Sequence, residues 1–338
     1  MWLRNLIVSL VLLVSLPLLG REFPLCLYGV DNPADLKLIQ KAGFTCIQTY
    51  QTDPEKLELL AQKAQKRGMQ VVFSPKKITT PYIQRAKEWP ILAWYLVDEP
   101  DVHKWSREKV IQAHNQTKQL FPQHLTTLVI GQGKTRVPYY DIPDAMMVDW
   151  YPVPHLQLTS FGDNVRYTQE GLAKTDMQDH PLWGVVQIFD WKNFKQYRPD
   201  NDRIGRFPTE NEIRFMSYHG ILNGATGLFY FIFTHQGKPL PQVAPMYWKR
   251  VKRVVHELAQ FRKIIERGKI VENTLSLPKP LTAKVWQYKE HYYMVLLNTT
   301  PDEVDVPPQL LDKKYKMLFG KKKSISMPSY DVWLLQFK

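Results

Sequence analysis

Residues 91–100 of the chain read ILAWYLVDEP. An unbroken apolar run is typical of a parallel strand that is covered on both faces, and here it ends in two carboxylates. Seven further runs of this kind alternate with helix-like segments between Phe23 and Gly268. Eight such strands predict an α/β fold, a closed (β/α)8 or TIM barrel. The predicted strands are Leu25–Val30, Phe44–Tyr50, Met69–Ser74, Ile91–Val97, Leu125–Ile130, Ala145–Trp150, Leu182–Phe189 and Gly227–Phe233.

Helix signals separate these runs. Thr209 and Glu212 form a capping-box pair that predicts a helix start, and Met246–Arg267 has the pattern of a long amphipathic helix. Residues 133–143 contain two prolines, so we expect only a short or irregular element there. Two further helices are predicted to begin where a capping side chain precedes a proline, at Asn32-Pro33 and Asp53-Pro54.

The pattern changes after Gly268, where short strand-like runs are separated by turns. We therefore expect a barrel over residues 21–270 and a small antiparallel, β-sandwich-like domain over residues 275–338. The predicted strands of this second domain are Val285–Tyr288, Tyr292–Asn298, Val304–Val306, Tyr315–Phe319 and Tyr330–Phe337.

The first residues resemble an export signal. Arg4 precedes an apolar stretch from Leu6 to Leu19, and Gly20 follows it, which predicts a signal peptide over residues 1–20. The stretch is short for a membrane span, which takes about 20 residues. We expect an exported protein, periplasmic or extracellular, with no stable membrane span after cleavage. An uncleaved anchor is the alternative.

Two cysteines, Cys26 and Cys46, lie in apolar runs. We expect buried free thiols, with a disulfide as the alternative in an exported protein. The sequence has no CxxC and no HExxH motif, so it implies no metal and no cofactor.

The net charge is +13, and many of the basic residues lie after residue 248. A solvated basic face is the simplest interpretation, and attraction to an anionic envelope or an acidic polysaccharide is a second one. No nucleic-acid motif accompanies the charge, so we expect no nucleic-acid partner. The sequence makes no prediction of the oligomeric state.

In such barrels the functional side chains stand at the carboxyl ends of the strands. Carboxylates, amides and aromatic rings collect there, which is the mixture that a sugar needs for hydrogen bonds and stacking. The residues expected to bind substrate are Tyr28, Gln48, Tyr50, Tyr151, Gln187, Asp190, Trp191 and His235, and the residues expected to act in catalysis are Glu99, Asp149 and Asp98. Lys76 also lies at a strand end, and we expect it to form a salt bridge with Asp98 or Glu99, with contact to an acidic sugar as the alternative.

Glu99, at the end of the fourth strand and before Pro100, resembles the general acid/base of the (β/α)8 glycoside hydrolase superfamily. The segments at 206–210 and 223–231 are also similar to a poorly characterised, glycosidase-like branch of that superfamily. Two departures stand out. The superfamily usually has Asn before the acid/base, where this chain has Asp98, and its nucleophile is a Glu near the place of Gln187.

The resemblance implies a glycoside hydrolase that acts on an oligo- or polysaccharide without a cofactor. Asp149 is the leading carboxylate partner of Glu99, and Asp190 is a further candidate for that role. Alternatively, Asp98 and Glu99 form a pair similar to that of substrate-assisted hexosaminidases, with Tyr151 holding the acetamido group. The other class of function is a non-catalytic carbohydrate-binding or cell-envelope protein on a glycosidase scaffold.

Overall fold

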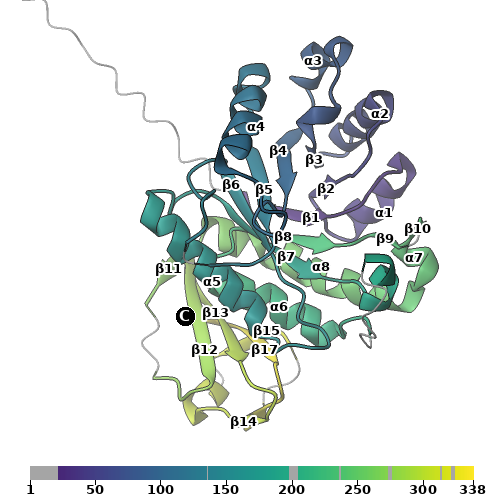
Figure 1. The fold of residues 1–338 in the computed structure, drawn as a ribbon. Coiled ribbons are helices and arrows are strands. Elements are labelled where there is room, and N and C mark those ends of the chain that lie inside the picture. Colours follow the sequence, from purple (N-terminus) through teal and green to yellow (C-terminus); the bar gives the residue numbers. More distant parts are fainter. Residues whose placement is uncertain are drawn as a thin grey trace, which may run out of the picture.

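The computed structural model describes residues 22–134, 136–197, 205–235, 237–272, 276–312, 314–320 and 324–338. Its centre is a closed barrel of eight parallel strands in sequence order, which confirms the predicted fold class. The helices lie around the barrel (Figure 1). The barrel strands are β1 (Leu25–Leu27), β2 (Cys46–Gln48), β3 (Gln70–Phe73), β4 (Ile91–Asp98), β5 (Thr126–Ile130), β6 (Ala145–Asp149), β7 (Leu182–Gln187) and β8 (Gly227–Phe231).

The helices begin where the capping signals predicted. The Thr209 hydroxyl accepts a hydrogen bond from the Glu212 amide at 3.2 Å, and the Glu212 carboxylate accepts one from the Thr209 amide at 2.7 Å, so the capping box is present. No helix forms between β5 and β6 in the described residues, as the prolines predicted. The α-helices are α1 (Leu36–Lys41), α2 (Pro54–Gln65), α3 (Thr80–Ala86), α4 (Arg107–Leu120), α5 (Ser160–Leu172), α6 (Glu210–Leu222), α7 (Leu240–Val243) and α8 (Pro245–Arg267), with 3-10 turns η1 (Pro33–Asp35), η2 (Pro75–Lys77), η3 (Ala173–Thr175) and η4 (Trp191–Tyr197).

The expectation of free thiols is wrong, because Cys26 and Cys46 form a disulfide inside the barrel. The two residues are register partners on β1 and β2. Both are fully buried, and their Cα atoms are 4.4 Å apart, which is within the range that a disulfide spans. The sequence placed both cysteines on neighbouring strands but could not give the register that brings them together.

Side chains alternate between the inside and the outside of the barrel. On β4, Ala93 and Tyr95 belong to the core inside the barrel, whereas Trp94 and Leu96 pack outward against the helices. The pairing of β4 with β5 shifts register between Tyr95 and Asp98. The strand therefore changes its alternation just before the acidic pair.

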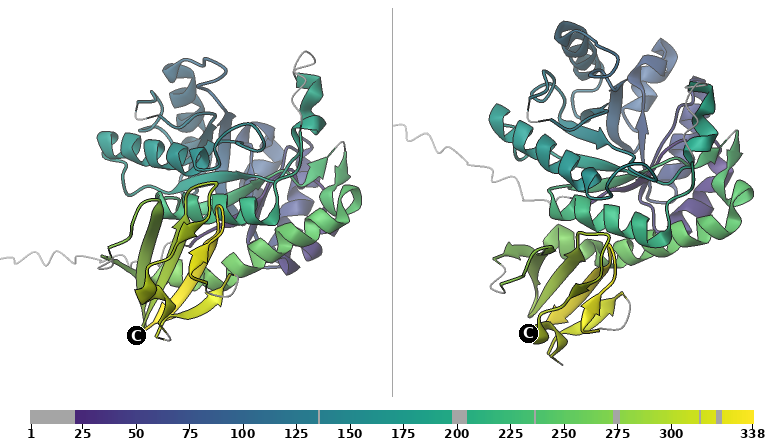
Figure 2. Two further views of the ribbon diagram at one scale, coloured as in Figure 1. Left: turned by 90° about the horizontal axis from the view of Figure 1, so that it is seen from below. Right: turned by 60° about the horizontal axis from the view of Figure 1, so that its bottom comes forward.

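The C-terminal strands form a five-stranded sheet in the order β11-β12-β13-β17-β15, and β14 pairs with β16. Figure 2 shows this sheet against one side of the barrel, beside α8. Val332 and Leu334 on one face join the barrel core, whereas Trp333 and Leu335 on the other face belong to a separate core. The bounds are β11 (Lys269–Val271), β12 (Leu281–Tyr288), β13 (His291–Asn298), β14 (Val304–Asp305), η5 (Pro308–Leu311), β15 (Lys316–Phe319), β16 (Ser326–Met327) and β17 (Val332–Phe337); the remaining strands, β9 (Thr234–His235) and β10 (Lys238–Pro239), pair after β8.

One buried arginine ties the sheet to the barrel. Arg214 on α6 donates from Nε to both carboxylate oxygens of Glu257 on α8, at 2.9 and 3.0 Å. Its Nη1 donates to the carbonyl of Val332 on β17 at 2.6 Å. Because these bonds join two helices and a strand, they fix the sheet against the barrel.

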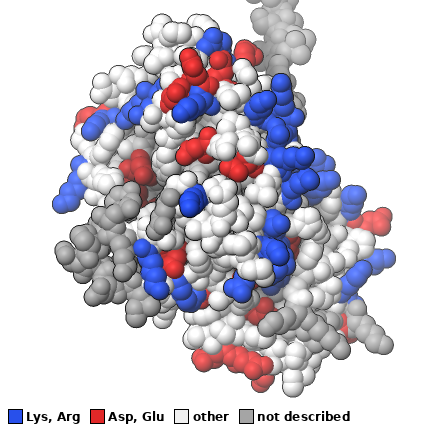
Figure 3. Space-filling model, turned by 90° about the vertical axis from the view of Figure 1, so that its right-hand side faces the viewer, with Lys and Arg blue, Asp and Glu red and all other residues white. Residues whose placement is uncertain are grey.

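The predicted signal peptide, residues 1–20, lies outside the described residues. Within the described part of the chain, no helix combines the length and the apolar character that a membrane crossing requires. Lys and Arg side chains gather in a band on the side of the molecule that carries α1, α2 and α7 in Figure 1, and acidic side chains are more scattered there (Figure 3).

Candidate active site

The carboxyl ends of the barrel strands open into a cavity of about 760 Å3. Its polar groups come from the ends of β1, β4 and β6, as expected for a barrel of this kind. Of the residues selected from the sequence, seven line this cavity: Tyr28, Tyr50, Asp98, Glu99, Asp149, Tyr151 and Trp191. The other lining residues are Val102, His103, Val129, Gly131, Trp150, Leu156, Phe189, Phe194, Phe231 and Ile232.

Glu99 holds an unusual backbone conformation directly after β4. Its φ is +38°, in the left-handed region that a side chain with a Cβ adopts at a cost of about 1–3 kcal/mol. Its carbonyl accepts hydrogen bonds from the amides of Val102 at 3.1 Å and His103 at 2.9 Å. These bonds hold the tight turn that directs the Glu99 side chain into the cavity.

The loop after β4 is also tied to the loop after β5. The carboxylate oxygens of Asp101 accept hydrogen bonds from the amides of Gly131 at 3.0 Å and Gln132 at 3.2 Å. A Cβ atom on Gly131 would lie 2.9 Å from Oε1 of Glu99, so only glycine leaves room for the Glu99 carboxyl group at this place. Asp101 and Gly131 therefore set the position of Glu99.

Asp149 ends β6 and is 8% exposed. Its Oδ2 accepts a hydrogen bond from the Tyr151 hydroxyl at 3.0 Å. No hydroxyl or N–H group of the described residues donates to Oδ1. Asp149 therefore places a buried carboxylate oxygen without a donor in the cavity that Glu99 also lines.

Both members of the pair have raised pKa values. Burial raises the pKa of Asp149 well above its usual range, and the charges of Glu99 and Asp98 raise it further. Burial also raises the pKa of Glu99, with added contributions from Asp98 and Asp101. Both carboxyl groups therefore keep their protons to higher pH than exposed carboxyl groups do. Glu99, the less buried of the two, faces the cavity.

Asp98 belongs to a separate network of phenols. Its Oδ1 accepts a hydrogen bond from the Tyr95 hydroxyl at 2.5 Å, and the rings of Tyr95 and Tyr28 meet edge to face with centroids 6.4 Å apart. Burial raises the pKa of both phenols well above their usual range, so both keep their protons and act as donors. Tyr95 was not among the residues selected from the sequence, although its place three residues before Asp98 on the predicted strand is a signal for it.

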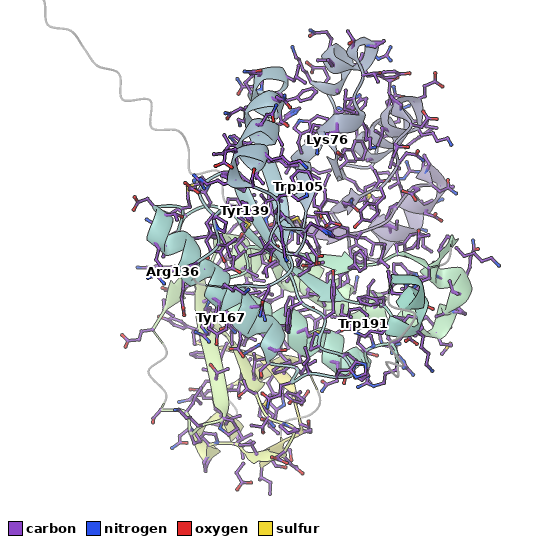
Figure 4. The ribbon with its side chains drawn as sticks, viewed as in Figure 1. Lys76, Trp105, Arg136, Tyr139, Tyr167 and Trp191 are labelled. Atoms are coloured by element: carbon purple, nitrogen blue, oxygen red, sulfur yellow. A yellow bond between two sulfur atoms is a disulfide. The ribbon has the colours of Figure 1, made fainter. Side chains whose placement is uncertain are left out.

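Aromatic rings form the walls of the cavity. Tyr151 stacks on Phe231, with ring centroids 5.5 Å apart, and Trp191 meets Phe189 edge to face at 4.9 Å. Tyr50 is 46% exposed. Figure 4 places Trp191 at one side of the barrel. Rings that border an open cavity provide flat apolar surfaces on which sugar rings stack.

Four selected residues lie outside the lining of this cavity. Gln187 is fully buried, and its amide group bonds the backbone N–H and carbonyl of Val153, both at 2.9 Å. Its side chain therefore fixes the loop after β6 and is not available to a substrate. Asp190 accepts a hydrogen bond from the Lys192 amide at 2.8 Å at the start of η4.

The other two are Gln48 and His235, which are 1% and 2% exposed. The amide of Gln48 bonds the backbone of Gly29 and Thr49, and Nδ1 of His235 bonds Asn193 at 3.1 Å. The expected salt bridge of Lys76 is not found, because no ion pair joins it to a carboxylate of the described residues. Its ammonium group instead lies 4.8 Å from the ring centroid of Trp105.

Among the residues that the structure describes, no group of three or more His, Cys, Asp or Glu side chains is arranged to hold a metal ion.

No family model matches the chain, and no curated protein matches its sequence. Solved structures do match its fold. Amy13B of Eubacterium rectale superposes with a TM-score of 0.61 at 11% identity, over 94% of this chain and 96% of its own. A glycoside hydrolase family 5 protein from Bacteroides vulgatus gives 0.59 at 12%, over 93% and 88%. The α-amylase of Geobacillus thermoleovorans, solved in complex with acarbose, gives 0.55 at 12%, over 94% and 98%.

These likenesses confirm the predicted (β/α)8-barrel fold.

Proposed function

We propose that the protein is a glycoside hydrolase that acts on an oligo- or polysaccharide, with Glu99 as its general acid/base. The observation that carries this proposal is that Glu99 and the buried Asp149 line one open cavity with aromatic walls. A catalytic carboxyl group works best when its pKa is raised toward the working pH. Burial and neighbouring carboxyl groups raise the pKa of both members of this pair.

The two members have different roles. The raised pKa of Glu99 keeps it protonated toward the working pH, and Glu99 gives this proton to the glycosidic oxygen as the bond to the sugar breaks. Asp149 is only 8% exposed, and as the carboxyl partner of Glu99 it acts on Glu99 rather than on the sugar ring. Asp98, positioned by the Tyr95 hydroxyl, is the second carboxylate that reaches the cavity, and it would activate water or orient an acetamido group.

A non-catalytic carbohydrate-binding protein is the second candidate, and Gln187 favours it. The superfamily's nucleophile is expected near this residue, yet the Gln187 amide is bonded to Val153 and Phe189 within the protein. A barrel that has lost this carboxylate would keep its aromatic cavity and bind glycans without cleaving them.

The proposal includes export to a compartment outside the cytoplasm. The disulfide between Cys26 and Cys46 supports it, because disulfides persist in oxidising compartments. Fractionation of the producing cells, with the N-terminus of the recovered protein determined by mass spectrometry, tests this part. Recovery of an unprocessed chain in the cytoplasmic fraction would contradict it.

The test of the activity is turnover of aryl glycosides and cell-envelope polysaccharides by the mature protein, beside Glu99→Gln. We expect Glu99→Gln to lower kcat/KM by about a thousandfold or more. Asp190→Asn is the matched control, because Asp190 lies outside the cavity lining, and it should retain parental activity. Glycan binding without turnover by any of the three proteins would support the carbohydrate-binding candidate instead.

A further inference from the structure

A second cavity, of about 380 Å3, borders the first. Tyr50, Asp98 and His103 line both of them, so the two form one continuous trough. The far end of the second cavity is formed by η2, which follows β3, and by the loop that leads into α4. A glycan long enough to pass Glu99 would extend into this second cavity.

The far end of the trough is basic. Lys76 and Lys77 line it together with Trp105. The Lys76 ammonium lies 4.8 Å from the centroid of the Trp105 ring, and the ammonium of Lys109 lies 3.7 Å from the same centroid. Figure 4 shows Lys76 and Trp105 near each other, on the side of the barrel away from Trp191. One indole ring therefore holds two cations beside the trough.

These lysines have no carboxylate counterpart in the part of the chain that the structure describes. None of Lys76, Lys77 and Lys109 forms an ion pair there. Burial lowers the pKa of Lys76, and the charges of Lys109 and Lys77 lower it further. The positive charges thus repel one another, and an anion bound among them would relieve this repulsion.

The opposite charge is concentrated in the first cavity and reaches its border with the second. Glu99 and Asp149 line the first cavity, and Asp98 lines both. An anionic substituent would be repelled from the first cavity and this border and attracted to the lysines at the far end. A charged glycan could lie in the trough in either direction and in different registers. The charges favour the arrangement that places the anionic substituent beside the lysines.

We propose that the second cavity binds an anionic substituent of the glycan, a sugar carboxylate or a sulfate or phosphate ester, through Lys76 with Lys77 and Lys109 beside it. The inference rests on the proposed function in one respect, because the same glycan chain occupies both cavities. It adds the substrate class, an acidic polysaccharide, and a residue that determines specificity. Trp105 is a positioning residue that holds the two ammonium groups.

The test is a binding measurement that does not need turnover. Glu99→Gln protein is titrated by calorimetry with oligosaccharides of polygalacturonate, alginate and hyaluronan, each beside its carboxyl-reduced, uncharged counterpart. Chondroitin sulfate, before and after desulfation, distinguishes a sulfate ester from a carboxylate, and a phosphorylated mannan, before and after dephosphorylation, covers the phosphate ester. We expect at least one charged glycan to bind about tenfold more tightly than its uncharged counterpart, with a preference that weakens as salt is added.

Lys76→Gln in the same background should remove this preference and leave the affinity for the uncharged counterpart unchanged. Lys63→Gln on α2 is the matched control, because it removes the same charge from an exposed site outside the trough, and it should keep the preference. Melting temperatures of both variants confirm that they are folded.

Equal affinities for every charged and uncharged pair, or a preference that survives Lys76→Gln, would overturn the inference. An equal loss in Lys63→Gln would do so as well, because it would show only a general effect of net charge. The outcome for the proposed function is separate. Hydrolysis of neutral glycans without any charge preference would support that function and reject the inference. Lys76-dependent binding without hydrolysis would support the inference and reject that function.

Discussion

An alanine at position 131 tests whether Glu99 works from the place that it holds in the structure. The added Cβ would lie 2.9 Å from Oε1 and 3.1 Å from Cδ of Glu99, and 2.6 Å from Cγ2 of Val102. Unbonded heavy atoms approach to about 3.5 Å at their best separation. The Glu99 carboxyl group must therefore move by roughly half an ångström, away from β5, and its position relative to Asp149 changes with it.

The expected effect on activity is larger than the effect on stability. A misplacement of about 1 Å at a reacting group costs about a hundredfold in rate, so we expect Gly131→Ala to lower kcat/KM by about tenfold or more. The displaced atoms lie at the ends of side chains rather than in the backbone, which limits the loss of stability to about 1–3 kcal/mol.

The assay is kcat/KM as a function of pH on the most reactive glycoside, with urea unfolding of the same samples. The double variant Val102→Ala with Gly131→Ala separates the two contacts, because it removes the clash with Val102 and keeps the clash with Glu99. Its free energy of unfolding should return toward the parental value, whereas its kcat/KM should stay as low as that of Gly131→Ala. Parental kcat/KM in Gly131→Ala across the whole pH range would refute the assignment of Glu99 as acid/base in this position.

Three further predictions concern single features of the fold. Tyr151→Phe removes the hydroxyl that lowers the pKa of Asp149, so the pH profile of kcat/KM should move to higher pH; an unchanged profile would count against a role of Asp149 in catalysis. Burial lowers the pKa of His219 to about 4 in the folded protein, and the unfolded chain, with a pKa of about 6.5, binds the proton first. Stability should therefore fall by about 2 kcal/mol between pH 7 and pH 5 in urea unfolding, and His219→Gln should flatten this dependence. Replacing both Cys26 and Cys46, which are 20 residues apart, with Ala should lower the free energy of unfolding by about 3 kcal/mol under oxidising conditions, and a reductant should then have no further effect.

The barrel could be predicted from the sequence because its strands are covered on both faces. Such strands are apolar at nearly every position, so a run such as ILAWYLV is visible without knowledge of its neighbours. Register is a relation between strands and leaves no local signal. The sequence therefore placed Cys26 and Cys46 on adjacent strands and could not show that they face each other across the pair β1-β2.

The site was predicted in part, by the rule that functional side chains stand at strand ends. That rule found Glu99, Asp98 and Asp149, because each lies at or just after the end of a strand. It gives no side-chain direction beyond the strand, and Gln187 shows the consequence. The loop after β6 folds back toward β7 and offers the backbone of Val153 to the Gln187 amide, a contact that depends on the path of a loop far away in the sequence.

The distribution of charge along the trough matches the charge distribution of the proposed ligand. No Lys or Arg of the described residues forms an ion pair with Asp98, Glu99 or Asp149, and the lysines near Trp105 are likewise without carboxylate partners there. Each group of like charges lowers stability by repulsion. An ion pair between Lys76 and Asp98 would have reduced the repulsion within both groups. Glu99, Asp149 and Lys76 have shifted pKa values and form no ion pair within the described residues, and such groups in a cavity are candidates for a functional site. The separation of the two charges is what a ligand with a neutral, reactive part and an anionic substituent would require.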